Sequence, residues 1–321
     1  MSDQLTNQEF ILPSPGLGTW KIPEELTPGI VFEAIETGYR HLDCAADYGN
    51  EQLVGEGIAK ALGAGLCRRE DLWVTGKLWN TYHRREHVRA ACERTLADLG
   101  LEQLDLFLIH FPIALAYVPF AEKYPPGWTG HGETMEPVSV PYSETWQAME
   151  ELVDAGLTKR IGFCNVGTAM IREVLSYARI KPTVLQVEMH PFLCQENLLR
   201  FCREIGLVVT AFSPFGADSY LPLGMAEESE RVLAHPVLEE VAAKHGKSTA
   251  QVALRWAEQR GTVPIPKTQS PEHLRENFAI PEFDLSPEEL AAISALDRHQ
   301  RFNDPAIFGE KAFKTFYPIF D

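Results

Sequence analysis

The amino-acid sequence predicts an α/β protein of the (β/α)8 TIM-barrel class. Eight short segments with strand-like composition alternate with longer segments in which apolar residues recur at helical spacing. The strand segments are apolar without interruption, as in Leu106-Phe107-Leu108-Ile109, which is typical of parallel strands covered on both faces. A doubly wound open sheet has the same alternation and is the alternative fold.

The predicted elements follow one another in a regular order along the chain. The strands are expected at residues 16–20, 40–44, 72–77, 104–109, 160–164, 184–188, 208–212 and 263–266, and helices at 28–37, 51–62, 86–99, 143–155, 169–178 and 196–205. Gly38, Gly100, Gly156 and Gly206 each follow a helical segment, where glycine commonly ends a helix. We expect residues 1–321 to form a single barrel domain.

Three connections are too long to be simple turns, namely residues 111–142, 214–234 and the C-terminal tail at 301–321. Active sites of such barrels lie at the carboxyl ends of the strands, which we call the mouth. We therefore expect these long loops and the tail to lie over the C-terminal mouth and to cover a pocket. Surface loops without a function are the alternative.

Composition and charge exclude several classes of function. The chain has 321 residues, with 45 Asp+Glu against 29 Lys+Arg and a formal net charge of -16. A negative balance of this size argues against binding to nucleic acid and to anionic membranes. The first ten residues show no secretory signal pattern, and the longest mostly apolar run, residues 106–121, is shorter than a membrane span. We expect a soluble protein of the cytoplasm.

The six cysteines are scattered and include no C-x-x-C pair; they are Cys44, Cys67, Cys92, Cys164, Cys194 and Cys202. Zinc ligation and disulfides are the functional alternatives. We expect reduced and mostly buried thiols, as is usual in a cytoplasmic protein.

Short motifs give little support to other activities. Gly55-Glu56-Gly57 lacks a third glycine and a preceding strand, and there is no P-loop motif. Residues 83–87 (HRREH) fit the H-x-x-E-H zinc-peptidase pattern, with Glu86 as a candidate general base. The neighbouring Arg84 and Arg85 would repel a dication, and no third ligand is evident. We therefore expect no metal.

Polar side chains close most of the predicted strands. They are Asp43, Lys77, His110, Asn165, Gln186 with Glu188 and His190, Ser213 and Lys267. Because the lower parts of the same strands are apolar, these positions predict a polar site at the mouth.

Asp43, Tyr48, Lys77 and His110 together form a complete set for carbonyl reduction, which we call the acid–base set. A tyrosine hydroxyl can protonate the carbonyl oxygen, and a nearby ammonium would lower the high pKa of the phenol. A carboxylate would hold that lysine charged, and a histidine would orient the carbonyl. Each residue alone also has a purely structural interpretation.

The sequence resembles the aldo-keto reductase superfamily over nearly the whole chain, from about residue 10 onward. The matching stretches are residues 42–51 (LDCAADYGNE), 77–80 (KLWN), 106–110 (LFLIH), 186–191 (QVEMHP), 265–267 (IPK) and 276–277 (EN). Within the superfamily it is most similar to the xylose (aldose) reductase branch, through residues 111–114 (FPIA), 122–127 (EKYPPG) and 301–305 (RFNDP).

The resemblance implies NADP(H) or NAD(H) bound without a Rossmann domain, and it implies a role for each matching residue. Tyr48 would be the proton donor, tuned by Lys77 and Asp43, with His110 orienting the substrate. The implied cofactor-binding residues are Thr19, Trp20, Asp43, Cys164, Asn165, Gln186, Phe212, Ser213, Phe215, Lys267, Thr268, Gln269, His273, Glu276 and Asn277. The implied substrate residues are Trp20, Asp47, Tyr48, His110, Phe111 and Asn303.

Three of these positions depart from the family pattern. Cys164 stands where a serine is usual before Asn165, and Phe212 replaces a tyrosine but keeps a stacking surface. His273 stands where an arginine usually binds the 2′-phosphate of NADPH. Because a neutral imidazole offers one donor instead of a charged fork, we predict a weakened preference for NADPH and appreciable use of NADH.

The sequence thus predicts an NAD(P)H-dependent reductase that converts an aldose such as D-xylose to the alditol. A reductase of another carbonyl metabolite, such as a sugar phosphate, a keto-sugar or a biosynthetic intermediate, is the alternative within the same class. A binding or structural protein on the same scaffold and a zinc peptidase are alternatives from other classes. We expect a small-molecule carbonyl substrate as the partner, and a monomer or a homodimer.

Overall fold

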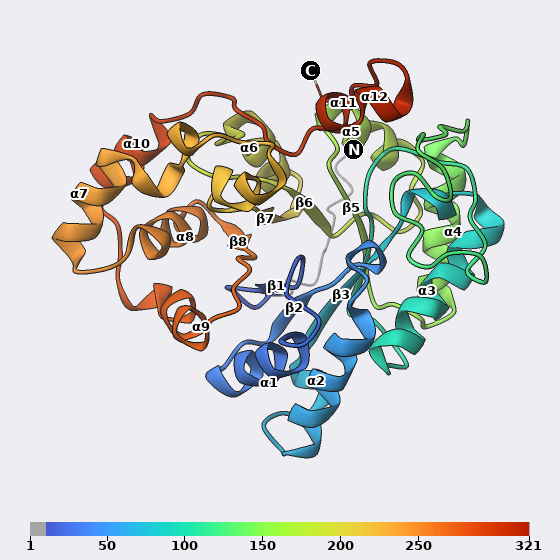
Figure 1. Cartoon of the computed structure of the whole chain (residues 1–321), viewed down its shortest axis with the longest axis horizontal. Coiled ribbons are helices and arrows are strands. Elements are labelled where there is room, and N and C mark those ends of the chain that lie inside the picture. Colours follow the sequence, from blue (N-terminus) through green and yellow to red (C-terminus); the bar gives the residue numbers. More distant parts are fainter. Residues whose placement is uncertain (1–10, 321) are drawn as a thin grey trace, which may run out of the picture.

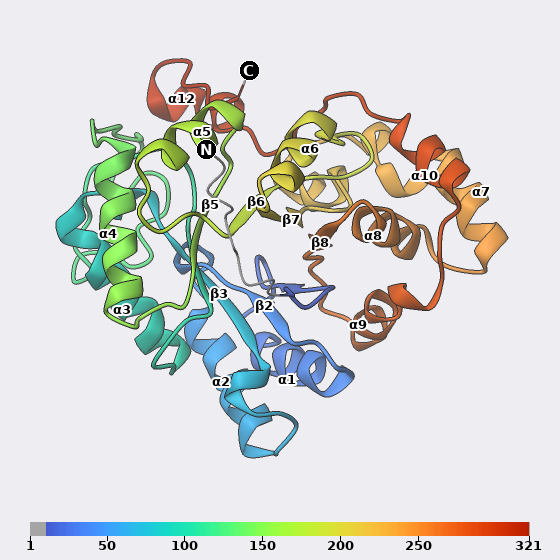
Figure 2. The same cartoon turned by 180° about the vertical axis from the view of Figure 1, so that it is seen from behind.

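The structure is a computed structural model that describes residues 11–320. The first ten residues, in which the sequence has no secretory signal pattern, lie outside the described residues. The strands lie at the centre of the molecule and the helices form a ring around them (Figure 1). The view from behind has the same arrangement (Figure 2).

The eight strands are all parallel and lie in sequence order. They are β1 Leu17–Gly18, β2 His41–Asp43, β3 Trp73–Leu78, β4 Leu106–Ile109, β5 Ile161–Cys164, β6 Val184–Glu188, β7 Val208–Phe212 and β8 Thr262–Pro264. The segments around β8 and β1 also pair, because Gly16 N donates to Pro264 O and Gly18 N to Pro266 O, both at 3.0 Å. The sheet therefore closes into the predicted (β/α)8 barrel, and the open doubly wound sheet is excluded.

The six predicted helices are all present, and further helices lie in the second half of the chain. The α-helices are α1 Thr27–Thr37, α2 Glu51–Gly63, α3 Arg85–Leu99, α4 Tyr142–Asp154, α5 Thr168–Tyr177, α6 Glu196–Glu204, α7 Pro236–His245, α8 Thr249–Gln259, α9 Pro271–Phe278, α10 Pro287–Ser294, α11 Pro305–Phe308 and α12 Glu310–Phe313. Short 3₁₀ helices are η1 Ala46–Tyr48, η2 Arg69–Asp71, η3 Asn80–Tyr82, η4 Ala217–Ser219, η5 Leu221–Leu223, η6 Glu228–Glu230, η7 Val232–Ala234 and η8 Ile280–Glu282.

The first strand is shorter than predicted. We expected a strand over residues 16–20, but β1 contains only Leu17 and Gly18. Thr19 N still donates to the Asp43 carbonyl oxygen at 3.1 Å, and the chain then turns at Lys21, whose φ of 61° lies in the left-handed region. This turn brings Trp20 to the mouth of the barrel.

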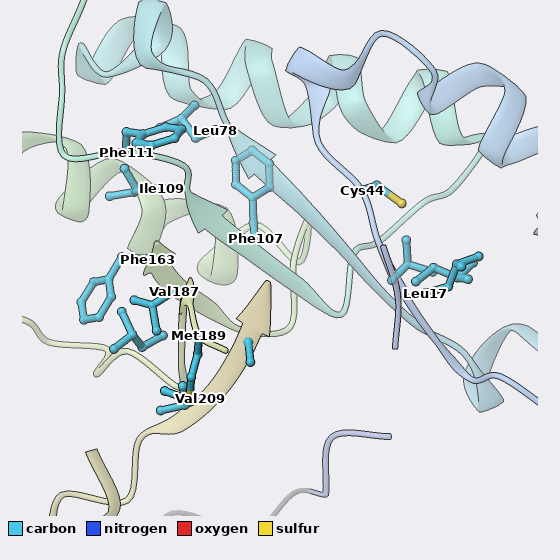
Figure 3. Close-up of a cluster of buried hydrophobic side chains, with 14 of the residues drawn as sticks. Leu17, Cys44, Leu78, Phe107, Ile109, Phe111, Phe163, Val187, Met189 and Val209 are labelled. Atoms are coloured by element: carbon cyan, nitrogen blue, oxygen red, sulfur yellow. The ribbon is translucent and has the colours of Figure 1, made fainter. Parts of the chain in front are cut away.

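Successive residues of one strand pack against different cores. Leu106 and Leu108 belong to an inner cluster with Cys164, whereas Phe107 and Ile109 belong to the large cluster shared with the helices. Figure 3 shows Phe107 and Ile109 on their strand within this large cluster. Because side chains of a strand alternate between its two faces, an apolar layer on both sides explains the uninterrupted apolar strands.

The three long connections meet over the mouth, as predicted. Trp128 of the first connection contacts Phe308 of the tail, with ring centroids 5.3 Å apart. Tyr220 of the second connection stacks on Phe302 of the tail at 5.7 Å. The tail leaves α10 and runs past α6 to α11 and α12 (Figures 1 and 2).

The alternative motifs have structural explanations. His83 is buried before α3 begins, and burial lowers its pKa to about 3, whereas the His87 ring stacks on Tyr117 at 3.7 Å. Within residues 11–320 there is no group of three or more potential ligands that could hold a metal ion. All six cysteines are free thiols, and only Cys67 is not buried.

Residues 11–320 contain no helix with the length and apolar character that a membrane span requires.

Candidate active site

The alternation of side chains along the strands positions the acid–base set. Counting in steps of two from the inner cluster residue Leu108 leads to His110 at the mouth, and the same rule brings Asp43 and Lys77 to the inner face. Tyr48 ends the short helix η1 that follows β2, and Gly49 terminates this helix with φ of 72°. The short helix η1 therefore places the Tyr48 hydroxyl beside Lys77, at the carboxyl ends of the strands.

Lys77 is the centre of the set, and its three N–H donors are all used. Its Nζ donates to Asp43 Oδ2 at 2.7 Å, to the Cys44 carbonyl oxygen at 2.8 Å and to Tyr48 Oη at 3.1 Å. An ammonium group has three protons, so this arrangement is complete. Since Tyr48 Oη accepts from Lys77, its own O–H remains available as a donor toward a ligand.

Burial and charge act in opposite directions on this pair. Burial alone would lower the pKa of Lys77, but Asp43 and Tyr48 raise it above its ordinary value, so the ammonium stays charged. Burial raises the pKa of Tyr48 above its ordinary value, and Lys77 opposes that rise only in part. Lys77 therefore acts on the phenol pKa in the expected direction, but desolvation outweighs the ammonium in the free protein.

His110 is a neutral imidazole in this site. Burial, reinforced by the positive charge of Lys77, lowers its pKa well below the ordinary value. Its ring lies edge-on to Tyr48 with centroids 5.8 Å apart, and edge-on to Trp79 at 5.3 Å. A neutral histidine beside the tyrosine hydroxyl can hydrogen-bond a carbonyl oxygen without competing for the proton.

Asp43 connects the acid–base set to Gln186 at the end of β6. Its Oδ1 accepts from Gln186 Nε2 at 2.7 Å, while its Oδ2 is bound to Lys77. Asn165 donates from Nδ2 to the His110 carbonyl oxygen at 2.9 Å and has a left-handed φ of 60°. Asn165 N also donates to the Gln186 carbonyl oxygen at 3.0 Å, so residues in or directly after β2, β3, β4, β5 and β6 are joined in one hydrogen-bonded network.

The set opens onto a cavity of about 850 Å³ at the mouth. Most of the residues predicted for the site line this cavity: Trp20, Asp43, Asp47, Tyr48, His110, Phe111, Asn165, Gln186, Phe212, Ser213, Phe215, Lys267, Thr268, Gln269, His273, Glu276, Asn277 and Asn303. A volume near the upper end of the range for ligand pockets fits a ligand of dinucleotide size together with a small substrate.

Three predicted site residues do not line the cavity. Lys77 is buried and reaches the cavity residue Tyr48 through the hydrogen bond at 3.1 Å. Thr19 donates from Oγ1 to the Asp43 carbonyl oxygen at 2.9 Å and is fully buried. Cys164 packs in the inner cluster, because it faces the barrel interior below the mouth.

One part of the cavity combines aromatic rings with a carboxyl group. Trp128 packs edge-on against Phe111 at 4.9 Å and against Phe308 at 5.3 Å. Burial raises the pKa of the Asp47 carboxyl to about 7, although Lys123 opposes the shift. An apolar wall with a polar group at its edge is suited to a small hydroxylated molecule.

The other side of the cavity has features that fit a pyridine dinucleotide. Asn165 Oδ1 is buried and accepts no hydrogen bond from the residues at 11–320, so it can accept one from a carboxamide. Phe212 contributes an aromatic side chain to the cavity wall. Burial lowers the pKa of Lys21 to about 8, and the charge of Lys267 contributes, so the two ammonium groups repel and an anionic phosphate would relieve this repulsion.

His273 lies at the outer edge of the cavity, near the start of α9. Ser270 caps this helix, accepting from His273 N at 3.4 Å, and its own N donates to Thr268 Oγ1 at 3.0 Å. Burial lowers the pKa of Lys267 at the same edge. Lys267, Thr268 and His273 all line the cavity.

Several lining residues were not predicted from the sequence, including Lys21, Trp128, Tyr220, Ser248, Thr249, Ala250 and Phe308. Residues 248–251 (STAQ) form a capping box in which Ser248 accepts from Gln251 N, a pattern readable from the sequence. Trp128 and Tyr220 lie in the long connections, and no local pattern indicates which of their residues reach the cavity.

The fold and the site together define an oxidoreductase barrel with a tyrosine–lysine–aspartate–histidine set at its mouth. The profile described as "Aldo/keto reductase family" matches residues 14–298. The chain therefore belongs to the aldo/keto reductase family.

Curated relatives match the chain over nearly its whole length. It is 46% identical over 316 residues to the probable NAD(P)H-dependent D-xylose reductase xyl1 of Arthroderma otae, covering 98% of this chain and 95% of that one. It is 47% identical over 297 residues to the NAD(P)H-dependent D-xylose reductase of Pachysolen tannophilus, with 92% and 93% coverage. The solved aldose reductase of Giardia lamblia superposes with a TM-score of 0.84 at 36% identity, covering 96% and 98% of the two chains.

Proposed function

We propose that the protein reduces the aldehyde of an aldose such as D-xylose to the alditol, with NADPH or NADH as the reductant. The observation that carries this proposal is the hydrogen bond at 3.1 Å from Lys77 Nζ to Tyr48 Oη beside the cavity. The names of the curated relatives, at 42% to 47% identity, support the same substrate and the same cofactors.

The residues of the chain perform the proton half of this reaction. When bound, the nicotinamide supplies a hydride to the carbonyl carbon. Tyr48 donates its proton to the carbonyl oxygen, and the charged Lys77 stabilises the phenolate that remains. His110 donates a hydrogen bond that holds the carbonyl oxygen near the Tyr48 hydroxyl. Asp43 keeps Lys77 charged in its buried position.

The remaining lining residues would hold the two ligands. Asn165 and Gln186 would bind the carboxamide, and Phe212 would stack on the nicotinamide ring. Lys21 and Ser213 would face the pyrophosphate, and Lys267 with His273 would face the adenosine ribose and its 2′ substituent. Trp20, Asp47, Phe111 and Asn303 would bind the sugar.

The proposal is tested by following NADPH and NADH consumption with D-xylose and with glyceraldehyde, a permissive aldehyde. We expect turnover of both, with xylose reaching saturation. Turnover of glyceraldehyde alone would contradict the xylose assignment and favour a different carbonyl metabolite on the same acid–base set. Turnover of neither would contradict the reductase assignment and favour a binding protein on this scaffold.

We also propose that residues 1–321 act as one domain, in the cytoplasm, as a monomer or a homodimer. The tail packs back on the mouth of the same barrel, and the six thiols are free, as in a reducing compartment. Light scattering of the purified protein and cell fractionation test these statements. A larger oligomer, or recovery outside the cytoplasm, would contradict them.

A further inference from the structure

Glu188 is a buried carboxylate near the active site that has no part in the proposed proton transfer. It ends β6 and lies two residues beyond Gln186, on the same inner face of the barrel. Its exposed fraction is 0%. Burying a carboxylate raises the free energy of the folded state unless hydrogen bonds replace its hydration. The hydrogen-bond partners of Glu188 therefore indicate its structural role.

Those partners are two consecutive main-chain N–H groups of the C-terminal tail. Phe302 N donates to Glu188 Oε1 at 3.0 Å, and Asn303 N donates to Oε2 at 2.9 Å. His190 Nε2 lies 3.1 Å from the same Oε1. Charge-assisted bonds from two neighbouring amides fix both the position and the direction of the tail.

The main chain of the tail is bonded to the barrel at a few separate points. Before it, Arg298 N and Gln300 N donate to the Phe192 carbonyl oxygen at 3.1 and 3.0 Å. After it, the next main-chain bond to the barrel is from Met135 N to Ala312 O at 2.9 Å. Among the described residues, the main chain of residues 301–311 is thus hydrogen-bonded to the rest of the barrel through Glu188 alone.

The attached residues reach into the site. Asn303 lines the cavity, and its Oδ1 is buried without a donor from residues 11–320. Phe302 stacks on Tyr220, whose Oη lies 2.8 Å from Ser213 Oγ. Displacement of this part of the tail would therefore move a polar group away from the substrate side of the cavity.

We propose that Glu188 is a positioning residue that holds Asn303 over the mouth, and that it sets the preference of the enzyme for long, polyhydroxylated aldehydes over short ones. This inference rests on the proposed function, because Asn303 is assigned there to the sugar. A pentose extends from the reacting carbonyl far enough to need a partner on the tail. A three-carbon aldehyde needs the acid–base set and little more.

Glu188→Gln tests the proposal with almost no change of volume. The amide oxygen can accept from only one of the two N–H groups, and its NH₂ would face the other. We expect the KM for D-xylose to rise roughly tenfold, as for the loss of about one hydrogen bond, with kcat little changed. The kcat/KM for glyceraldehyde should stay within about threefold of the wild-type value.

Glu150→Gln is the matched control. Glu150 of α4 is also a buried carboxylate, and its Oε1 accepts from two consecutive main-chain amides, Arg179 N at 2.7 Å and Ile180 N at 2.9 Å. These amides lie between α5 and β6, at the end of the barrel opposite the mouth. Glu150→Gln also removes a buried charge, but its amide oxygen can keep both bonds, so it should lose no more thermal stability than Glu188→Gln. It should keep the wild-type ratio of kcat/KM for xylose to that for glyceraldehyde.

A double-mutant cycle separates positioning from general loosening. If Glu188 acts through Asn303, Glu188→Gln should have little further effect on the xylose KM in an Asn303→Ala background. Additive effects of the two changes would overturn the proposal. An unchanged xylose KM in Glu188→Gln would overturn it as well.

Hydrogen–deuterium exchange provides a readout that does not depend on activity. Glu188→Gln should speed exchange in peptides covering residues 298–304, and Glu150→Gln should not. Unchanged exchange there would overturn the anchoring role whatever the kinetics. Failure of the wild-type enzyme to reduce either aldehyde would instead contradict the proposed function, and exchange would still decide whether Glu188 anchors the tail.

Discussion

At the residue scale, the proton donor depends on which atom of Tyr48 is already occupied. Lys77 donates to the hydroxyl oxygen, so the phenol proton is directed elsewhere. Burial keeps the phenol protonated at neutral pH in the free protein, since it raises the pKa. The proton is therefore present when a carbonyl arrives, and the ammonium stabilises the charge left behind.

Tyr48→Phe removes this proton and should lower kcat by at least about a hundredfold, the lower end for a lost general acid. Cofactor binding, followed by fluorescence quenching, should stay near normal. Tyr39→Phe is the control, because Tyr39 is another buried tyrosine, and its hydroxyl donates to the Leu274 carbonyl oxygen at 3.1 Å. Retention of most activity in Tyr48→Phe would mean that another group is the donor.

His273 governs the expected choice between NADPH and NADH. The wild-type preference for NADPH in kcat/KM should stay below about a thousandfold, or about 4 kcal/mol. His273→Arg should raise that preference roughly tenfold, because a guanidinium adds a charged, forked donor at the cavity edge. Glu272→Gln changes the net charge by the same amount on the neighbouring residue of α9, which does not line the cavity. An equal response of both variants would show a general charge effect instead.

At the element scale, the barrel depends on close approach between adjacent strands. Gly162 of β5 pairs with Val184 of β6, and a Cβ at Gly162 would lie 2.2 Å from the Val184 carbonyl oxygen and 2.8 Å from Leu108 Cδ2. The obstacle is main-chain, so it cannot move aside as a flexible side chain would. Glycine at this position is therefore required by packing, although its φ is ordinary.

Gly162→Ala should destabilise the protein by about 1–3 kcal/mol, as for an overpacked core. Gly29→Ala is the control, because Gly29 lies in α1 with nothing within 4 Å of its added Cβ. Alanine in a helix is favoured over glycine, so the control should be neutral or stabilising. Denaturant unfolding of both variants checks this, and equal stability of Gly162→Ala and the wild type would contradict the strand spacing.

At the scale of the whole molecule, buried ionisable groups determine how stability changes with pH. Glu51 at the start of α2 is buried, and burial raises its pKa from 4.5 to about 8. The unfolded chain releases this proton near pH 4.5, whereas the folded protein keeps it up to about pH 8. The contribution of Glu51 is therefore fully present below pH 4.5 and is lost as the pH rises toward 8.

Glu51→Gln should remove this loss and keep an acceptor for Thr95 Oγ1, which lies 3.2 Å from Glu51 Oε2. We expect the Tm of the wild type to fall between pH 6 and pH 8, because this interval lies below the raised pKa of Glu51. The Tm of Glu51→Gln should fall less over the same interval. Glu56→Gln, on the exposed side of the same helix, should follow the wild type. Parallel curves for Glu51→Gln and the wild type would contradict the buried-acid interpretation.

The barrel class, the order of the strands and the acid–base set could all be predicted from the sequence. These depend on local signals: uninterrupted apolar strands mark sheets covered on both faces, and the polar residue that ends such a strand must lie at the mouth. The same rule predicts that Asp43, Lys77 and His110 lie close together at the mouth. The short extent of β1 was missed, because the turn at Lys21 has no sequence signal.

Features that depend on contacts between distant segments could not be predicted from the sequence and are seen in the folded structure. It showed that burial outweighs Lys77 at Tyr48, because desolvation depends on everything packed around the phenol. The structure also shows that Cys164 packs in the inner cluster and that Trp128 lines the cavity. It also brought the tail onto Glu188, 114 residues away in sequence, because main-chain amides, which every sequence shares, make that contact.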